Sequence, residues 1–335
     1  MSIRSALLAC VTALVAVPAV ADEVNVYTTR QAFLIEPVME AFTKETGVAV
    51  NLAFIEKGLV ERLKSEGSRS PADLVMTVDI ANLQQIVDAD VLQPVDNAAL
   101  KAAVPEALRS PDDLWFGLTT RARVIYASKD RVKDGEVTTY EDLTSEKWRG
   151  RICTRPGVHD YNLALLAAVI GHHGEAVAKD WAAGLKANLA RKPEGNDRGQ
   201  VKAIWAGECD ISLTNTYYMG AMLADPEQKA WADSVRIIFP AFENGGTHLN
   251  VSGVAMTKAA PNKDAAVKLM EFLVSPAAQA IYAEANHEFP VLAGARKSDL
   301  VASWGEFTPD TLNLTELAKL RPAALRIMEE VGYDN

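Results

Sequence analysis

Two adjacent tyrosines, Tyr217 and Tyr218, lie in the sequence context that most strongly suggests chemistry. They follow the run Asp210–Leu213, which predicts a strand, and they precede Met219–Asp225, which has the pattern of a helix. A strand that gives way to a helix within a few residues brings its last side chains to the carboxyl edge of an α/β sheet, where such folds bind ligands. The alternative is that Tyr217 packs inward while Tyr218 lies on the surface.

A third tyrosine, Tyr161, precedes an apolar segment that predicts a helix from Asn162 to Gly171, so we expect it at the same edge. Phenolate is a hard oxygen donor, and a phenol with a pKa near about 10 loses its proton at neutral pH only to a strongly polarising cation. Ferric iron is such a cation, whereas softer metals prefer thiolate or imidazole, which do not cluster in this sequence. Three phenolates would cancel the charge of Fe(III) and leave octahedral positions for water or a small anion.

Such an anion would need positive partners. Arg30 lies in a predicted loop, and Arg121 and Arg123 lie in a long extended segment, so these three are the anion-binding candidates. Each also has a simpler interpretation. Arg30 could form an ordinary salt bridge, and Arg121 and Arg123, on one face of an alternating strand, could form a solvated edge.

Four further polar residues follow predicted strands and are candidates for the same cleft: Thr29, Gln31, Asp79 and Asn215. For Asp79 we favour a different role, the N-cap of the helix that begins at Ile80. His159 and His248 also lie in candidate site segments, although a lone histidine is more often exposed or hydrogen-bonded than a ligand.

Strands and helices alternate through the chain with short loops, which predicts an α/β fold with parallel sheets covered on both faces. Two long extended stretches, 118–126 and 248–257, interrupt this alternation and predict a two-strand hinge between two lobes. The first lobe would comprise 22–119 plus about 248–295, and the second about 124–245. We expect the segment 296–335 to pack on the second lobe.

Residues 1–21 have the pattern of a secretory signal, with Arg4, an apolar run and the small-residue sequence Ala19–Ala21. We therefore expect an exported protein that begins at Asp22. Without this segment the chain has 33 Lys and Arg against 44 Asp and Glu, a net charge of −11. This balance argues against a nucleic-acid partner, because binding phosphates requires a basic face.

Beyond the signal segment the chain contains two cysteines, Cys153 and Cys209, both in strand-like runs. An oxidising compartment would allow them to pair if the strands are neighbours. Two buried free thiols are the alternative. The adjacent histidines His172 and His173 would point about 100° apart in a helix, so they cannot share a metal ion as residues four apart can.

The chain resembles the periplasmic ferric-iron-binding proteins of bacterial ABC importers. The resemblance extends over nearly all of the chain after the signal segment, and its most specific motif is T-Y-Y-M-G at 216–220. The other matching segments are V-N-V-Y-T-T-R-Q at 24–31, P-A-D-L-V-M-T-V-D at 71–79, W-F-G-L-T-T-R-A-R-V-I-Y at 115–126, D-Y-N at 160–162 and N-L-A-R-K-P at 188–193.

The resemblance implies a type II periplasmic binding protein that is monomeric and delivers ferric iron to an inner-membrane ABC permease. Tyr161, Tyr217 and Tyr218 would be iron ligands. Some members of the family have a histidine, a tyrosine or a glutamate where this chain has Gln31, Ala32 and Val78. The chain is therefore similar to the subgroup whose protein ligands are tyrosines of the second lobe, with a carbonate or bicarbonate anion completing the coordination.

The alternative function is a receptor of the same fold for an organic cation, such as thiamine or a polyamine, or for a phosphonate. Such a ligand favours aromatic walls, whereas the tryptophans here fall mostly in or beside predicted helices. We do not expect an enzyme, because the sequence contains no G-x-S-x-G, no H-E-x-x-H and no carboxylate pair in the site loops.

Overall fold

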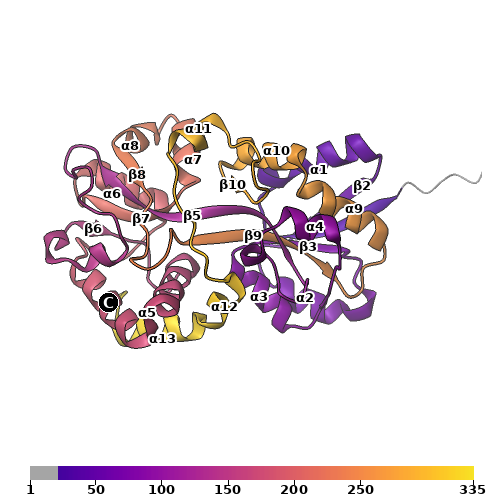
Figure 1. Cartoon of the computed structure of the whole chain (residues 1–335), viewed down its shortest axis with the longest axis horizontal. Coiled ribbons are helices and arrows are strands. Elements are labelled where there is room, and N and C mark those ends of the chain that lie inside the picture. Colours follow the sequence, from indigo (N-terminus) through magenta and orange to yellow (C-terminus); the bar gives the residue numbers. More distant parts are fainter. Residues whose placement is uncertain (1–21) are drawn as a thin grey trace, which may run out of the picture.

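The computed structural model describes residues 22–335, so the expected signal segment lies outside the described residues. The chain forms two lobes joined by long strands (Figure 1). Within residues 22–335, no helix is both long enough and apolar enough to cross a membrane.

The first lobe is built on a parallel sheet, β2-β1-β3, in which the antiparallel strand β9 pairs with β3. Its strands are β1 (Glu23–Thr28), β2 (Ala49–Phe54), β3 (Leu74–Val78) and β4 (Leu92–Gln93), and its helices are α1 (Ala32–Thr46), α2 (Leu59–Glu66), α3 (Ile80–Asp88), α4 (Ala98–Ala103), α9 (Lys263–Leu273) and α10 (Pro276–Asn286). Alternation along β1 explains the layers: Val24 and Val26 pack in a core with α1 and α9, whereas Tyr27 packs with α2 and α3 on the other face.

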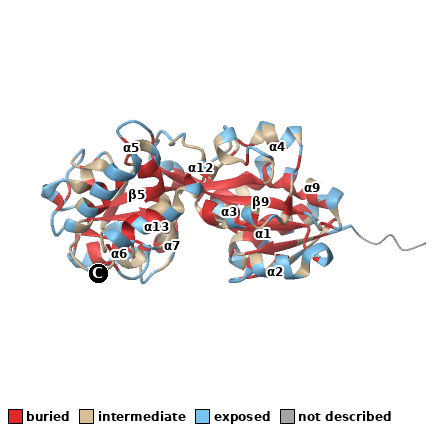
Figure 2. Cartoon of the chain, turned by 90° about the horizontal axis from the view of Figure 1, so that it is seen from below, coloured by how far each residue is buried: buried red, intermediate tan, exposed pale blue. Residues whose placement is uncertain are grey.

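Two strands connect the lobes, as the sequence predicts. They are β5 (Phe116–Ser128) and β9 (Leu249–Thr257), and every residue in both is buried (Figure 2). The first half of β5 pairs with β9, and its second half pairs with β7 and β8 of the second lobe. One continuous strand therefore belongs to both sheets.

The second lobe surrounds a smaller sheet. Its elements are β6 (Ile152–Cys153), α5 (Asp160–Ala187), α6 (Asp197–Ala206), β7 (Ile211–Asn215), α7 (Tyr218–Ala224), α8 (Lys229–Asp233) and β8 (Val235–Ile238). Helix α5 is interrupted at Gly174, where φ is 82° and ψ is 166°. The helix predicted from Asn162 to Gly171 corresponds to the first part of α5, and the left-handed Gly174 is the reason that the second part does not continue it in a straight line.

The last part of the chain contains β10 (Phe289–Pro290), α11 (Asp299–Ser303), α12 (Leu314–Lys319) and α13 (Arg321–Glu330). Helix α13 packs on α5, while α12 contacts both α3 of the first lobe and α5 of the second. Leu314 and Leu317 of α12 join a core that is continuous between the lobes. The segment 296–335 is thus not confined to the second lobe. Short 3₁₀ turns occupy Gly67–Arg69, Glu106–Leu108, Glu141–Thr144 and Glu146–Trp148.

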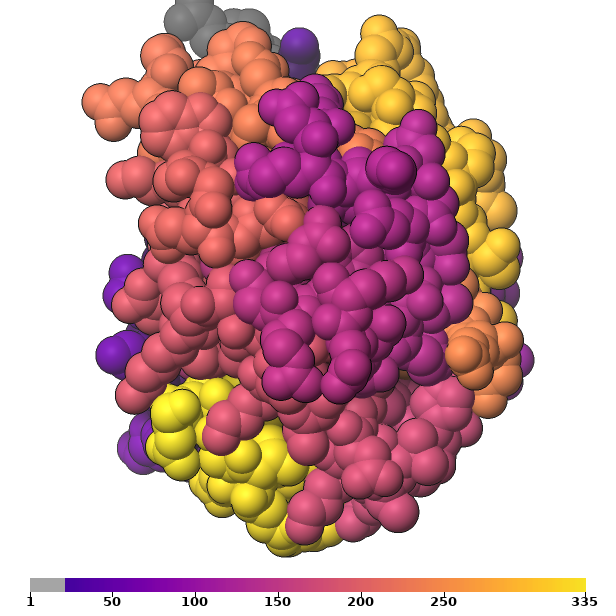
Figure 3. Space-filling view, turned by 90° about the vertical axis from the view of Figure 1, so that its left-hand side faces the viewer, coloured from indigo at the N-terminus to yellow at the C-terminus, as the bar shows by residue number. Residues whose placement is uncertain are grey.

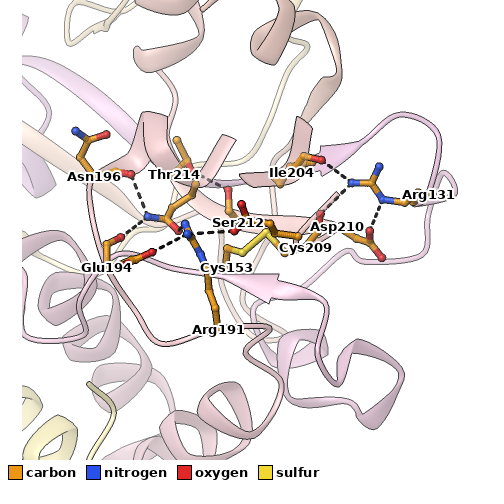
Figure 4. The surroundings of a disulfide bond; sticks show 12 residues. Arg131, Cys153, Arg191, Glu194, Asn196, Ile204, Cys209, Asp210, Ser212 and Thr214 are labelled. Atoms are coloured by element: carbon orange, nitrogen blue, oxygen red, sulfur yellow. Dashed lines mark hydrogen bonds and ion pairs between the residues drawn. A yellow bond between two sulfur atoms is a disulfide. The ribbon is translucent and has the colours of Figure 1, made fainter. Parts of the chain in front are cut away.

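A disulfide joins Cys153 in β6 to Cys209, which precedes β7, with 5.9 Å between their Cα atoms (Figure 4). The parallel pairing of β6 with β7 makes these positions neighbours. Arg131 donates to the Cys209 carbonyl at 2.9 Å, and Asp210 bonds both Arg131 and Arg151. The start of β7 is therefore fixed covalently and electrostatically.

We predict that replacing both Cys153 and Cys209 with serine lowers the free energy of unfolding by about 4 kcal/mol, because the bond closes a loop with a sequence separation of 56 residues. Urea unfolding of the oxidised parent and the double variant measures this difference. Mass spectrometry of the unreduced parent supplies the control. Two alkylatable thiols in the folded parent would contradict the prediction.

Candidate metal centre between the lobes

Tyr217 and Tyr218 emerge where β7 ends and α7 begins. The turn is fixed to β5: Thr216 N donates to the Ala122 carbonyl at 3.1 Å, and the buried Tyr126 hydroxyl donates to the carbonyls of Asn215 and Thr216. Because β5 is buried along its length, the tyrosine pair is held by a rigid element.

Tyr161 lies in the first turn of α5. Its backbone N–H donates to Nδ1 of the N-cap residue His159 at 3.2 Å, and the two rings meet edge to face with centroids 4.7 Å apart. The next residue, Asn162, donates to the carbonyls of Arg155 and Pro156. His159 therefore has a capping role here, and burial lowers its pKa to about 4, an effect that the nearby Arg155 reinforces.

The three phenols converge. The hydroxyl oxygens of Tyr161 and Tyr217 are 3.1 Å apart, and the ring centroids of Tyr217 and Tyr218 are 4.3 Å apart. All three line one cavity of about 480 Å³. The alternative in which Tyr217 packs inward and Tyr218 faces outward is therefore wrong.

Residues from both lobes line this cavity. From the first lobe and the connecting segments come Thr29, Arg30, Gln31, Phe33, Leu34, Val78, Arg121, Ala285, Asn286, His287 and Glu288, and from the second come Tyr161, Arg198, Tyr217, Tyr218, Ala221 and Ala224. The lobes also approach closely here: a Cβ on Gly220 would lie 2.1 Å from Cδ2 of His287, so a larger residue would have to displace the His287 ring.

Two candidate arginines face the cavity, and both are buried. Arg30 Nη2 lies 2.8 Å from Glu288 Oε2, while Arg121 Nη1 donates to Ser252 at 2.8 Å and lies 3.8 Å from the other Glu288 oxygen. Burial opposes ionisation of Glu288, but the two guanidinium groups hold its pKa below the usual value. Two cations share one carboxylate, so the cluster has net positive charge. Within residues 22–335, Arg30 Nε and Nη1 have no hydrogen-bond partner.

Arg123 is placed differently. It is buried beneath Tyr161 and does not line the cavity formed by residues 22–335. Its Nη1 lies 2.7 Å from Asp197 Oδ2, and Arg155 Nη1 lies 3.3 Å from the other oxygen of the same fully buried carboxylate. The guanidinium carbons of Arg155 and Arg123 lie 4.8 and 5.8 Å from the Tyr161 ring centroid. Both guanidinium groups are therefore within cation–π distance of the Tyr161 ring.

Asp79 and Asn215 are also outside the cavity lining of the described residues. Asp79 is the N-cap of α3, as we favoured: its carboxylate accepts from Ala81 N at 2.9 Å and from Asn250 Nδ2 at 2.8 Å. Asn215 accepts from Arg123 Nη1 at 3.2 Å. Thr29 and Gln31 do line the cavity.

Burial raises the pKa of Tyr217 well above 10, and the neighbouring phenols Tyr161 and Tyr218 add to this effect. Burial also raises the pKa of Tyr218 to about 12. Both hydroxyls are therefore protonated at neutral pH in the metal-free protein. A cation that binds them as phenolates must displace these protons.

Several residues of this centre are absent from the sequence-based candidates, namely Asp197, Glu288, Arg198, His287 and Phe33. Glu288 is 258 positions from Arg30, and Asp197 is 74 from Arg123. No local pattern connects such partners. The sequence offers one indirect signal for these carboxylates. Arg121 and Arg123 lie in a strand that connects the lobes, and buried arginines require carboxylate partners.

Comparison with known proteins agrees with this architecture. The Synechocystis iron uptake protein A1 is 46% identical over 319 residues, covering 94% of this chain and 89% of that protein. A thiamine-binding periplasmic protein of Escherichia coli is more distant, at 26% identity over 283 residues, covering 81% of this chain and 82% of that protein.

Solved structures show the same fold. The ferric iron-binding protein A of Mannheimia haemolytica, in an open conformation, superposes with a TM-score of 0.91 at 51% identity, covering 94% of this chain and 100% of that one. A Trichodesmium protein in complex with iron and citrate ligands superposes with a TM-score of 0.89 at 43% identity, covering 93% and 99%. The family model of the bacterial extracellular solute-binding proteins matches residues 38–309, and the chain belongs to that family.

Proposed function

We propose that the chain is a periplasmic receptor that captures ferric iron between its lobes and delivers it to an inner-membrane ABC permease as a monomer. Tyr161, Tyr217 and Tyr218 are the iron ligands in this proposal. The observation that carries it is the convergence of three phenols on one cavity, with the Tyr161 and Tyr217 oxygens 3.1 Å apart. The iron-binding relatives support the choice of metal.

The donor set favours a hard trivalent cation. Within residues 22–335, no group of three His, Cys, Asp or Glu side chains is arranged to hold a metal. Softer metals would require such thiolate or imidazole donors. Three phenolates would neutralise Fe(III), and the guanidinium groups of Arg155 and Arg123 lie against the Tyr161 ring.

The anion that completes the coordination binds at Arg30 and Arg121 in our proposal. Arg30 has two buried N–H groups free of partners among the described residues, which suits the planar oxygens of carbonate or bicarbonate. The cavity of about 480 Å³ also has room for a larger polycarboxylate. Citrate is the second candidate, since a relative binds iron with citrate. Arg123 has no direct part in our proposal, because it does not line the cavity of the described residues and its Nη1 and Nη2 bond Asp197, Asn215 and Asn162.

Ligand contacts from both lobes would favour a closed state. The tyrosines come from the second lobe, whereas Arg30 and Glu288 come from the other side of the cavity. Within the described residues, no tryptophan lines this cavity, and its aromatic lining is three tyrosines and the exposed Phe33. The thiamine-binding relative is more distant from this chain than the iron uptake protein, so the ferric-iron function is favoured over thiamine, polyamine or phosphonate binding.

We predict that Tyr217→Phe or Tyr218→Phe weakens ferric iron binding by more than about 100-fold, since even losing a group that only orients a ligand costs about 10–100-fold. The ring stays in place, so the free energy of unfolding should change by no more than about 1.5 kcal/mol. Competition with a chelator measures affinity, and urea unfolding measures stability.

Tyr27→Phe is the matched control, because its hydroxyl contacts Glu66 and Arg62 away from the cavity. It should bind iron as the parent does. If the Tyr217 and Tyr218 variants also match the parent, the tyrosines are not ligands.

Iron affinity should rise with pH. The raised pKa values of Tyr217 and Tyr218 keep both phenols protonated, so binding releases at least two protons and lower pH opposes it. The association constant should fall by up to about 100-fold per pH unit between pH 8 and pH 6. Chelator competition corrected for the chelator's own protonation measures the slope. A slope of zero would contradict phenolate coordination.

The anion site can be tested with Arg30→Lys, which keeps the charge but removes the planar fork of donors. We expect about tenfold weaker iron binding in bicarbonate buffer and a smaller difference when bicarbonate is excluded. Arg149→Gln removes an exposed charge elsewhere and serves as the control. Repeating the titration with citrate distinguishes the two anions. Equal loss in every buffer would show that Arg30 acts only through Glu288.

A further inference from the structure

The segment that follows α13, Val331–Asn335, lies against the loop 154–159, which leads from β6 to the tyrosine at the start of α5. The Asp334 carboxylate accepts from Gly157 N at 2.6 Å and from Val158 N at 3.2 Å. The Tyr333 hydroxyl lies 3.0 Å from Thr154 Oγ1. Three polar contacts therefore connect two segments more than 170 positions apart.

Packing reinforces these contacts. Tyr333 is buried, and a Cβ on Gly157 would lie 2.5 Å from its ring, so the loop approaches the ring as closely as glycine allows. Lys186 Nζ donates to the Val331 carbonyl at 3.0 Å, which ties the segment to the far end of α5. Figure 3 shows the C-terminal residues, in yellow, at the lower edge of the second lobe.

The inner side of the same loop faces the metal centre. Arg155 contacts the Tyr161 ring and pairs with Asp197, while Asn162 bonds the carbonyls of Arg155 and Pro156. The loop is thus held on one side by the site and on the other by Tyr333 and Asp334. Its own backbone forms only a turn, with His159 N donating to the Pro156 carbonyl at 3.1 Å, so these side-chain contacts contribute much of what fixes its conformation.

We propose that Asp334 and Tyr333 are positioning residues for the iron ligand Tyr161. They act from outside the cavity by fixing the loop that carries Arg155 and ends at the first turn of α5. This inference rests on the proposed function. A carboxylate that accepts two backbone N–H groups forms charge-assisted hydrogen bonds, which are stronger than neutral ones. Its loss would let the loop, Arg155 and the Tyr161 ring sample other positions.

The test compares Asp334→Ala with Asp334→Asn and with Asn335→Ala. Alanine removes both acceptors, asparagine keeps one oxygen, and Asn335→Ala changes a neighbour that contacts neither Thr154 nor the loop amides among the described residues. We expect about three- to tenfold weaker iron binding and a shifted visible phenolate-to-iron band for Asp334→Ala, less than the loss for a group that bonds a ligand directly. Asparagine should be intermediate, and Asn335→Ala should match the parent.

Hydrogen exchange of the iron-free proteins supplies a readout that needs no metal. Amides of residues 154–163 should exchange faster in Asp334→Ala, while β5 and β7 stay protected. If Asp334 contributes only to global stability, fully folded Asp334→Ala keeps the parent's visible band and iron affinity. That result would overturn the proposal. If the parent itself gives no band with iron, the proposed function fails instead.

Discussion

Strand β5 hydrogen-bonds with β9 in one lobe and with β7 and β8 in the other, and the arrangement of the cleft depends on this shared pairing. The change of partner occurs between Arg121, which is opposite Asn250, and Arg123, which is opposite Asn215. Because the strand is buried throughout, both arginines must find partners inside the protein. Arg121 contributes to the cavity wall, and Arg123 lies against the Tyr161 ring on the other side of the site.

The charges around the cavity form two related groups. On the first-lobe side Arg30 and Arg121 share Glu288, and on the second-lobe side Arg123 and Arg155 share Asp197. Each group has one more cation than anion. Removing one partner of a buried ion pair typically costs about 3–5 kcal/mol, so the paired carboxylates also hold the arginines in place. The excess charge suits a site that must bind phenolates and a small anion together.

Much of the fold follows from local patterns in the sequence. The two connecting strands lie where continuous extended runs occur, and Asp79 caps α3 as its position suggests. Alternation correctly places Arg121 and Arg123 on one face of a strand. The alternative in which this face is a solvated edge is wrong, because both side chains are buried. Local pattern cannot show that the strand changes sheets between them.

Partners distant in sequence could not be predicted in the same way. The helices α11 to α13 are short, and their positions depend on contacts with α3 and α5 rather than on strong periodicity. Glu288 and Asp197 occupy segments without a recognisable motif. The Tyr333 and Asp334 contacts likewise depend on α13 packing along α5, which brings the last residues back to the loop before Tyr161.

The central claim is that three tyrosines bind ferric iron in this cavity, and the visible spectrum of the purified protein tests it most directly. Ferric citrate is titrated beyond one equivalent into the protein beginning at Asp22, at neutral pH. We predict a phenolate-to-iron charge-transfer band that saturates at one iron per chain. A protein that stays colourless in this titration yet binds thiamine or another organic cation would contradict the account.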